Sequence, residues 1–286
     1  MTLNELIISI ELGLILSILA LGIFITFRII DFPDLTCDGS FALGSVISAV
    51  MIKANFNPLI ALFFAAIAGA IAGGITAFLN RVIGIKALLA GILVAFMLYS
   101  INLRIMGGLA NISTLGKPSI FIIFGEFYSL IAIVLILVCI LSIIFYTDFG
   151  LSLRAAGKNI ILSKNLGISI TKSYVYALCL SNALIALSGA LLCQYQGFAD
   201  ANSGTGMLII GLVSVMLGER FIDTKSIAIL LVLTVFGAII YRIFIAISLG
   251  SSFLGLQSHD LNLITGLMVI AIMWIKRKET ETIEYA

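Results

Sequence analysis

Long apolar runs constrain this chain more than any other feature. About nine of them follow one another along the sequence, and roughly 20 predominantly apolar residues suffice for one helical membrane span. The predicted spans cover residues 5–27, 37–53, 58–80, 86–103, 127–146, 173–195, 204–217, 226–247 and 262–275. The second, seventh and ninth runs are short, so tilted or re-entrant segments fit them. The prediction is an all-α, polytopic transmembrane helical bundle of about 8–9 spans.

The composition supports the same fold class and excludes others. Hydrophobic residues make up 62% of the chain and charged residues 10%, against about 45–50% and about 25% in soluble domains, so the solvent must be membrane lipid. No soluble segment or internal repeat interrupts the sequence, which indicates a single transmembrane domain over 1–286. The net charge of +2 comes without a basic cluster interleaved with aromatics, so no nucleic-acid partner is expected. The four cysteines lie far apart and are interpreted as packing residues.

The distribution of Lys and Arg predicts how the chain lies in the membrane. With nine spans, the basic connections 81–86, 147–172 and 218–225 and the basic tail fall on one side, whereas 196–203 and 248–261 contain neither Lys nor Arg. Cytoplasmic loops carry the excess of positive charge. We therefore predict a cytoplasmic C-terminus and an outer N-terminus.

A basic, polar segment between two spans, 147–172, is the clearest functional feature. Asn159 suits the N-cap of a short helix, and Gly167 suits the left-handed residue that ends it. One interpretation is a cytoplasmic helix that docks into a groove on a partner protein. The other is a basic loop lying on anionic lipid headgroups. The residues proposed for docking are Ala155, Gly157, Lys158, Asn159, Ile161, Leu162, Leu166 and Gly167.

Phosphate binding by this segment is not expected. Gly157 and Lys158 resemble the end of a P-loop, but Ser152 stands where the first glycine belongs and Asn159 follows the lysine. Nucleotide energy, if used, must come from another subunit, and the chain itself needs no cofactor.

Polar residues crowd the connection between the first two predicted spans. Pro33 breaks the helix there, and Asp38, Gly39 and Ser40 follow it. Non-helical backbone at membrane depth occurs where it lines a cavity or is buried in protein. One interpretation makes these three residues, together with Asn111, part of a translocation path. The alternative is a solvated loop in which Asp38 or Ser40 caps the second helix.

Four stretches carry a family resemblance. They are LRAAGKNIILSKNLGI at 153–168, FRIIDFPDLTCDGSFALGSVI at 27–47, RIMGGLANISTLGKPSIF at 104–121 and GLVSVMLGE at 211–219. The chain resembles permease subunits of the branched-chain amino acid and sugar permease superfamily of ABC importers, in particular the tryptophan/tyrosine type. The resemblance implies that the protein lies in the bacterial plasma membrane and that residues 160–166 form a short cytoplasmic coupling helix. It also implies a homodimer of permeases, cytoplasmic ATPase subunits, an extracytoplasmic solute-binding protein, and a small solute such as an aromatic amino acid.

Two other function classes remain to be compared with this one. A stand-alone secondary transporter or channel would need relay carboxylates at mid-depth or an inverted repeat, and Glu11 and the aspartates of 31–38 are the available candidates. An intramembrane enzyme would need a catalytic constellation. His259 and Asp260 have neither a nucleophile nor a second ligand beside them, so no catalytic or metal site is predicted.

Overall fold

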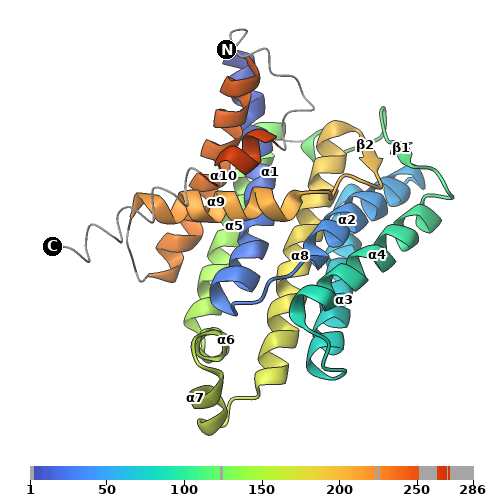
Figure 1. The fold of residues 1–286 in the computed structure, drawn as a ribbon. Helices are drawn as coiled ribbons and strands as arrows, with labels where there is room; N and C mark the ends of the chain where they lie inside the picture. Colours follow the sequence, from blue (N-terminus) through green and yellow to red (C-terminus); the bar gives the residue numbers. More distant parts are fainter. Residues whose placement is uncertain are drawn as a thin grey trace.

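The computed structural model describes residues 3–122, 125–222, 224, 226–250, 263–268 and 270, and this part of the chain is mostly helical (Figure 1). The elements are α1 (Leu3–Ile23), the π-helix η1 (Phe24–Ile29), α2 (Thr36–Lys53), α3 (Pro58–Arg81), α4 (Ala87–Ile105), β1 (Asn111–Ser113), the 3₁₀ turn η2 (Ile120–Ile122), α5 (Glu126–Tyr146), α6 (Asp148–Lys158), α7 (Ile160–Asn165), α8 (Ile170–Gln196), β2 (Phe198–Asp200), α9 (Met207–Phe221) and α10 (Ile227–Gly250). The two short strands β1 and β2 pair antiparallel.

Six helical segments of the described chain are long and apolar enough to cross a membrane. They are Asn4–Ile29, Pro58–Arg81, Ala87–Ile105, Glu126–Tyr146, Ile170–Gln196 and Ile227–Ser248. The other three predicted spans are not confirmed. The run 37–53 forms α2, whose first turns carry Asp38, Gly39 and Ser40. The run 204–217 yields α9, whose 15 residues reach only about 23 Å at 1.5 Å per residue. The run 262–275 lies largely outside the described residues.

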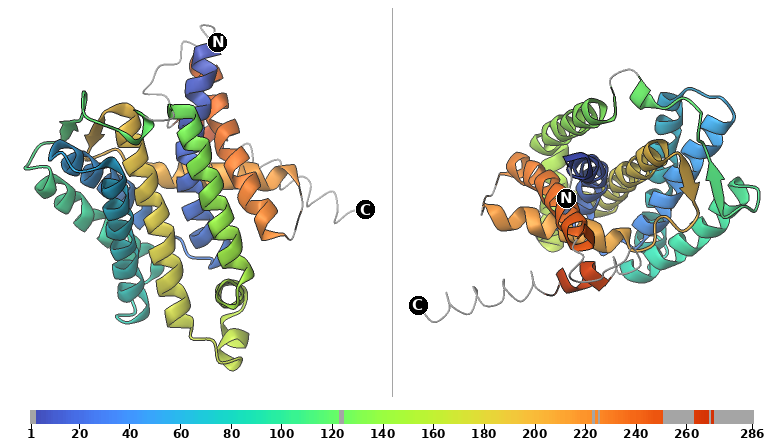
Figure 2. Two further views of the ribbon diagram at one scale, coloured as in Figure 1. Left: turned by 180° about the vertical axis from the view of Figure 1, so that it is seen from behind. Right: turned by 90° about the horizontal axis from the view of Figure 1, so that it is seen from above.

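Two helices begin inside the bundle and not at one of its ends (Figures 1 and 2). α1 descends from the N-terminal end, and after η1 an irregular connection carries the chain back toward mid-height, where α2 begins. α9 crosses the bundle nearly perpendicular to α1 and α10, starting beside α2. Both helices therefore begin in the interior of the protein, and their first backbone N–H groups need partners there.

The basic connections 81–86 and 147–169 lie at the same end of the molecule, opposite the N-terminus (Figures 1 and 2). This arrangement agrees with the predicted common side for these two connections. The sidedness of the membrane itself stays a prediction.

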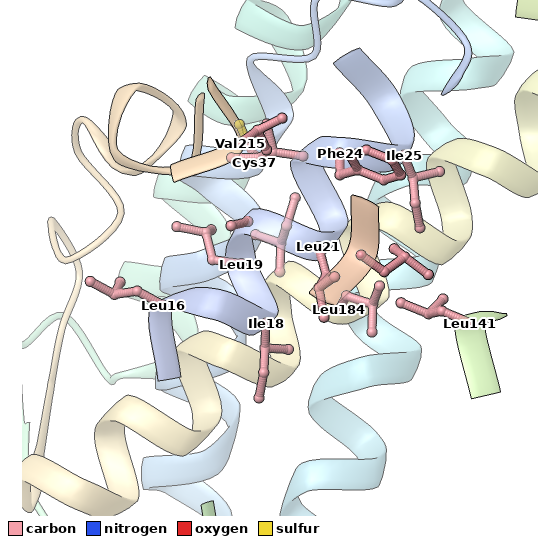
Figure 3. Packing of buried hydrophobic residues seen from close by; sticks show 14 of the residues in the cluster. Leu16, Ile18, Leu19, Leu21, Phe24, Ile25, Cys37, Leu141, Leu184 and Val215 are labelled. Carbon is pink, nitrogen blue, oxygen red and sulfur yellow. The ribbon is translucent and has the colours of Figure 1, made fainter. Parts of the chain in front are cut away.

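The core forms around α1 and α8. In the view from above, α1 stands among α5, α8, α9 and α10, and α8 separates it from α2, α3 and α4 (Figure 2). In the most apolar stretch of the span that contains α1, 72% of the residues are buried, against 22% in the span formed by α5. α1 is therefore internal and α5 peripheral. Figure 3 shows the packed side chains: Leu16, Ile18, Leu19, Leu21, Phe24 and Ile25 pack with Cys37, Leu141, Leu184 and Val215.

Glycines bring α2 and α3 into backbone contact with α8. A Cβ added at Gly69 or Gly73 of α3 would overlap the carbonyl oxygens of Asn182 and Leu178 on α8. At Gly44 of α2 it would overlap the Ala186 backbone. Small residues at such spacing allow helices to approach closely in lipid, where packing rather than the hydrophobic effect holds them together.

The adjacent glycines of α3 allow a matched test of this packing. A Cβ at Gly73 would overlap the Leu178 carbonyl, whereas at Gly74 it would meet only the Cys179 sulfur at 3.2 Å. We expect Gly73→Ala to destabilise the protein by about 1–3 kcal/mol through overpacking. Gly74→Ala gains helix propensity of up to about 1 kcal/mol and should not destabilise it. Thermal melting of the purified variants in detergent measures the difference, and equal melting temperatures would contradict the assigned interface.

Candidate functional site

The break between η1 and α2 is stabilised by a buried carboxylate. Asp34 is 2% exposed, and its Oδ1 accepts a hydrogen bond from the backbone N–H of Thr36 at 2.9 Å, in the first turn of α2. The side chain thereby satisfies a donor that the start of an interior helix leaves open. Neither Asp38 nor Ser40 caps α2, and both Asp34 and Ser40 are buried. The solvated-loop interpretation of this segment is therefore wrong.

Asp34 also begins a polar network that joins α2 to α8. Its Oδ2 accepts a hydrogen bond from Asn182 Nδ2 at 2.7 Å, and Asn182 Oδ1 accepts one from Ser40 Oγ at 2.7 Å. Thr36 Oγ1 lies 2.6 Å from Thr76 Oγ1 of α3. A buried network of this kind is stabilising when every member has a partner, because an unpaired member costs far more in a low dielectric. The start of α2 is thus fixed to both neighbouring helices.

Asp38 connects the start of α2 to the start of α9. Its Oδ2 accepts a hydrogen bond from Gly206 N at 3.1 Å, and its Oδ1 accepts one from Leu208 N at 2.9 Å. A carboxylate at this position also interacts favourably with the positive end of the α9 dipole. Gly204 is needed nearby, because a Cβ there would overlap the carbonyl oxygen of Asp38. The first turns of α2 and α9 are therefore joined by hydrogen bonds into one structural unit.

A cavity of about 500 Å³ lies beside this unit. Three segments build its wall: the start of α2, one face of α4, and the connection between β2 and α9. Small-molecule sites are typically about 300–1,000 Å³ and mostly apolar, with a few polar groups. The lining residues are Leu35, Asp38, Gly39, Ala42, Ile92, Ala95, Phe96, Tyr99, Asn102, Ala201, Asn202, Gly204 and Thr205.

The residues predicted for a translocation path fall into three places. Asp38 and Gly39 line the cavity, and Gly39 also lets α2 approach α4, since a Cβ there would come within 3.0 Å of the Ala95 Cα. Ser40 points to Asn182 instead. Asn111 is exposed on β1, where it pairs with Asp200, and is not among the lining residues. Their role in a path stays a prediction.

The predicted caps of the short helix at 160–166 are confirmed. Asn159 Oδ1 accepts a hydrogen bond from Leu162 N at 3.0 Å, and Gly167 has a positive φ of 81°. Helix α7 lies at the extreme end of the molecule, beyond the ends of the spans (Figure 1). The apolar side chains of α7 and of its C-cap residue Leu166 are largely uncovered: Ile160, Ile161, Leu162 and Leu166 are 45%, 76%, 56% and 69% exposed. Ala155 is half-buried on α6, and Lys158 is exposed at its end.

This end of the molecule is in direct contact with the segment that leads to Asp34. A Cβ added at Gly157 of α6 would overlap the carbonyl oxygen of Ile29, at the end of η1. The next carbonyl, that of Ile30, accepts a hydrogen bond from the Tyr174 hydroxyl of α8 at 3.1 Å. The guanidinium of Arg81 stacks on the Tyr174 ring at 3.5 Å. α6 therefore contacts the backbone only a few residues before Asp34.

Helices that begin inside an apolar bundle, beside a cavity, are an arrangement that many transporters use to build a site. A family model described as branched-chain amino acid transport system / permease component matches residues 6–273. The chain belongs to this family of permease components, which confirms the resemblance predicted from its sequence.

Individual relatives extend the comparison. The chain is 38% identical to the tyrosine transport system permease protein of Clostridioides difficile (strain R20291), over 91% of this chain and 88% of the relative. It is 37% identical to an uncharacterized protein of Rickettsia prowazekii (strain Madrid E), over 96% and 99% of the two chains. A solved transporter described as metal-chelate type ABC, in an inward-facing conformation, aligns with a TM-score of 0.53 and 11% identity, over 94% of this chain and 84% of that one. That likeness supports the fold alone.

Sequence reasoning missed two features of the site. The pairing of Asp38 with the α9 N-terminus joins residues about 170 positions apart, and no local pattern indicates it. The contribution of α4 did have a signal. Ile92, Ala95, Phe96, Tyr99 and Asn102 recur at three- and four-residue spacing, which places them on one helix face.

The link between Asp38 and α9 can be tested by substitution. Asp38→Ala removes both acceptors and leaves the α9 N–H groups unpaired, so we expect a loss of about 1–2 kcal/mol of stability. Asp38→Asn retains one acceptor oxygen and should lose clearly less. Thermal melting in detergent ranks the three proteins, and an Asp38→Ala variant as stable as the wild type would contradict the assigned cap.

Proposed function

We propose that this chain is the permease subunit of an ATP-binding cassette importer that moves a small amino-acid-type solute into the cytoplasm. Two copies form the translocation unit, with ATPase subunits at the end that carries α7 and a solute-binding protein at the opposite, outer end. The chain carries out no bond chemistry. The similarity to a tyrosine transport permease favours tyrosine, tryptophan or a related solute. The C-terminus lies in the cytoplasm of a bacterial cell, and the protein crosses the inner membrane.

The observation that carries the proposal is the exposed, capped helix α7. Its four uncovered apolar side chains extend beyond the spans, at the end where the basic connections gather. Apolar side chains exposed together in this way mark an interaction surface. A groove on an ATPase subunit would bury them, with Lys158 and Lys164 at its polar edge.

The contact between Gly157 and η1 supplies the transmission step. Closure of the ATPase subunits moves α7 and, through the continuous chain, α6. Because α6 touches the backbone of Ile29, the motion reaches the start of α2 and with it the cavity. This motion would make the cavity accessible first from one side of the membrane and then from the other.

Docking through α7 predicts a charge-sensitive interface. Ile161→Glu places a carboxylate where an apolar side chain would be buried, and charged groups are costly to desolvate. We expect at least a tenfold loss of ATPase subunit that co-purifies with the tagged permease. The matched control is Leu109→Glu, an equally apolar, 55% exposed residue after α4. Both variants should remain monodisperse, and retention of the ATPase by Ile161→Glu would count against α7 as the docking helix.

Transmission through Gly157 predicts an uncoupled transporter. Gly157→Val should wedge α6 away from Ile29, so that ATP hydrolysis continues while uptake falls at least tenfold. Ser152→Val provides the control on the same helix, because the Ser152 hydroxyl bonds back to the Phe149 carbonyl of its own helix at 2.7 Å. ATPase activity and solute uptake are measured together in proteoliposomes. Fully coupled uptake by Gly157→Val would exclude this route.

A further inference from the structure

A buried amide in the wall of the cavity lacks a partner. Asn102 of α4 is fully buried and lines the cavity, and neither its Nδ2 nor its Oδ1 has a hydrogen-bond partner among the described residues. Buried side-chain amides are nearly always bonded, and exceptions call for an explanation. The comparison with Asn182 is direct: that amide is equally buried, and both its atoms bond to Asp34, Ser40 or the Leu178 carbonyl. The free amide of Asn102 is consistent with a ligand group as its missing partner.

Two aromatic rings stand on the same face of α4. Phe96 is 71% exposed and Tyr99 is 42% exposed, and both line the cavity. Rings of this kind provide apolar contact and favour edge or stacked packing with another ring. The part of the cavity formed by α4 therefore suits an aromatic or large apolar group.

The charge of the cavity wall is negative. Asp38 is the acidic residue in the wall, and neither Lys nor Arg is among the lining residues. Its carboxylate accepts two backbone N–H bonds and retains lone pairs that a cation could approach. The site thus favours a ligand that carries an ammonium group over a purely anionic one.

From these features we infer that the cavity is a solute-binding site within the permease itself, and that it takes an α-amino acid with an aromatic or large apolar side chain. The solute ring packs on Phe96 and Tyr99, and its ammonium faces Asp38. Asn102 donates from Nδ2 to the carboxylate and accepts at Oδ1 from the ammonium, which uses both halves of the amide. This inference rests on the proposed function and deepens it, because it makes the permease a second point of selection after the binding protein.

The burial of Asn102 links binding to motion. Both amide atoms are inaccessible to solvent in this conformation, so a solute reaches them only when α4 shifts relative to the rest of the cavity wall. A solute that gains bonds only in the shifted state stabilises that state. Recognition by Asn102 would therefore favour the conformational change that transport requires.

The test is equilibrium binding of radiolabelled L-tyrosine to the purified permease–ATPase complex in nanodiscs, without the binding protein. The wild type should bind saturably, and Asn102→Leu should weaken binding at least tenfold. Tyramine, which lacks the carboxylate, and L-alanine, which lacks the ring, should each compete at least tenfold less well than L-tyrosine.

Thermal melting separates a binding role from a structural one. Asn102→Leu removes an unpartnered polar group from a buried position, so its melting temperature should equal or exceed that of the wild type. The matched control is Asn80→Leu on α3, which loses the hydrogen bond from Asn80 Nδ2 to the Ile85 carbonyl. That variant should melt at a lower temperature and bind L-tyrosine as the wild type does.

Two results would overturn the inference: absence of saturable L-tyrosine binding, or equal affinity in the wild type and Asn102→Leu. ATP-dependent uptake by the complete transporter in proteoliposomes, with its binding protein, distinguishes this failure from a wider one. If uptake of the solute remains ATP-driven in both proteins, the site is wrong and the proposed function stands. If the wild type does not couple ATP hydrolysis to uptake, the proposed function fails as well.

Discussion

Two carboxylates hold together the part of this protein on which the rest depends. In an apolar bundle, every helix that begins in the interior exposes N–H groups that lipid cannot satisfy. Asp34 satisfies the start of α2, and Asp38 satisfies the start of α9. These side chains stabilise the first turns of both helices, and the cavity lies beside those turns. The same residues that stabilise the break therefore shape the candidate site.

The sequence predicts elements well where the signal is local. Six of the nine apolar runs form helices that can span, and the caps at Asn159 and Gly167 follow from residue type alone. Prediction fails where long-range contacts decide. The apolar run 204–217 looks like a span, but it forms a crossing helix because Asp38 fixes its start in the interior. The Asp34–Asn182–Ser40 network gives no local sequence signal either, since Asn182 lies more than 140 residues from both Asp34 and Ser40.

The site combines a rigid part with a part that can move. α2, α3 and α8 touch through backbone atoms at Gly44, Gly69 and Gly73, which leaves no room for independent sliding. α6 and α7 extend outside this packed unit and contact it at Gly157. In the proposed mechanism, a force applied to α7 reaches the start of α2 and the cavity through the connection that follows η1.

The π-helical turn η1 gives that connection a particular mechanical property. A π-helix closes its hydrogen bonds from residue i to i+5, so Phe24–Ile29 contains one residue more than an α-helical turn requires. Conversion to α-helical bonding would release that residue, turning the following chain by about 100° and advancing it by about 1.5 Å. The last residue of η1, Ile29, makes the contact with Gly157, and its first residue follows directly on α1. Because Phe24, Ile25 and Ile29 are buried, such a change would repack these side chains against the neighbouring helices.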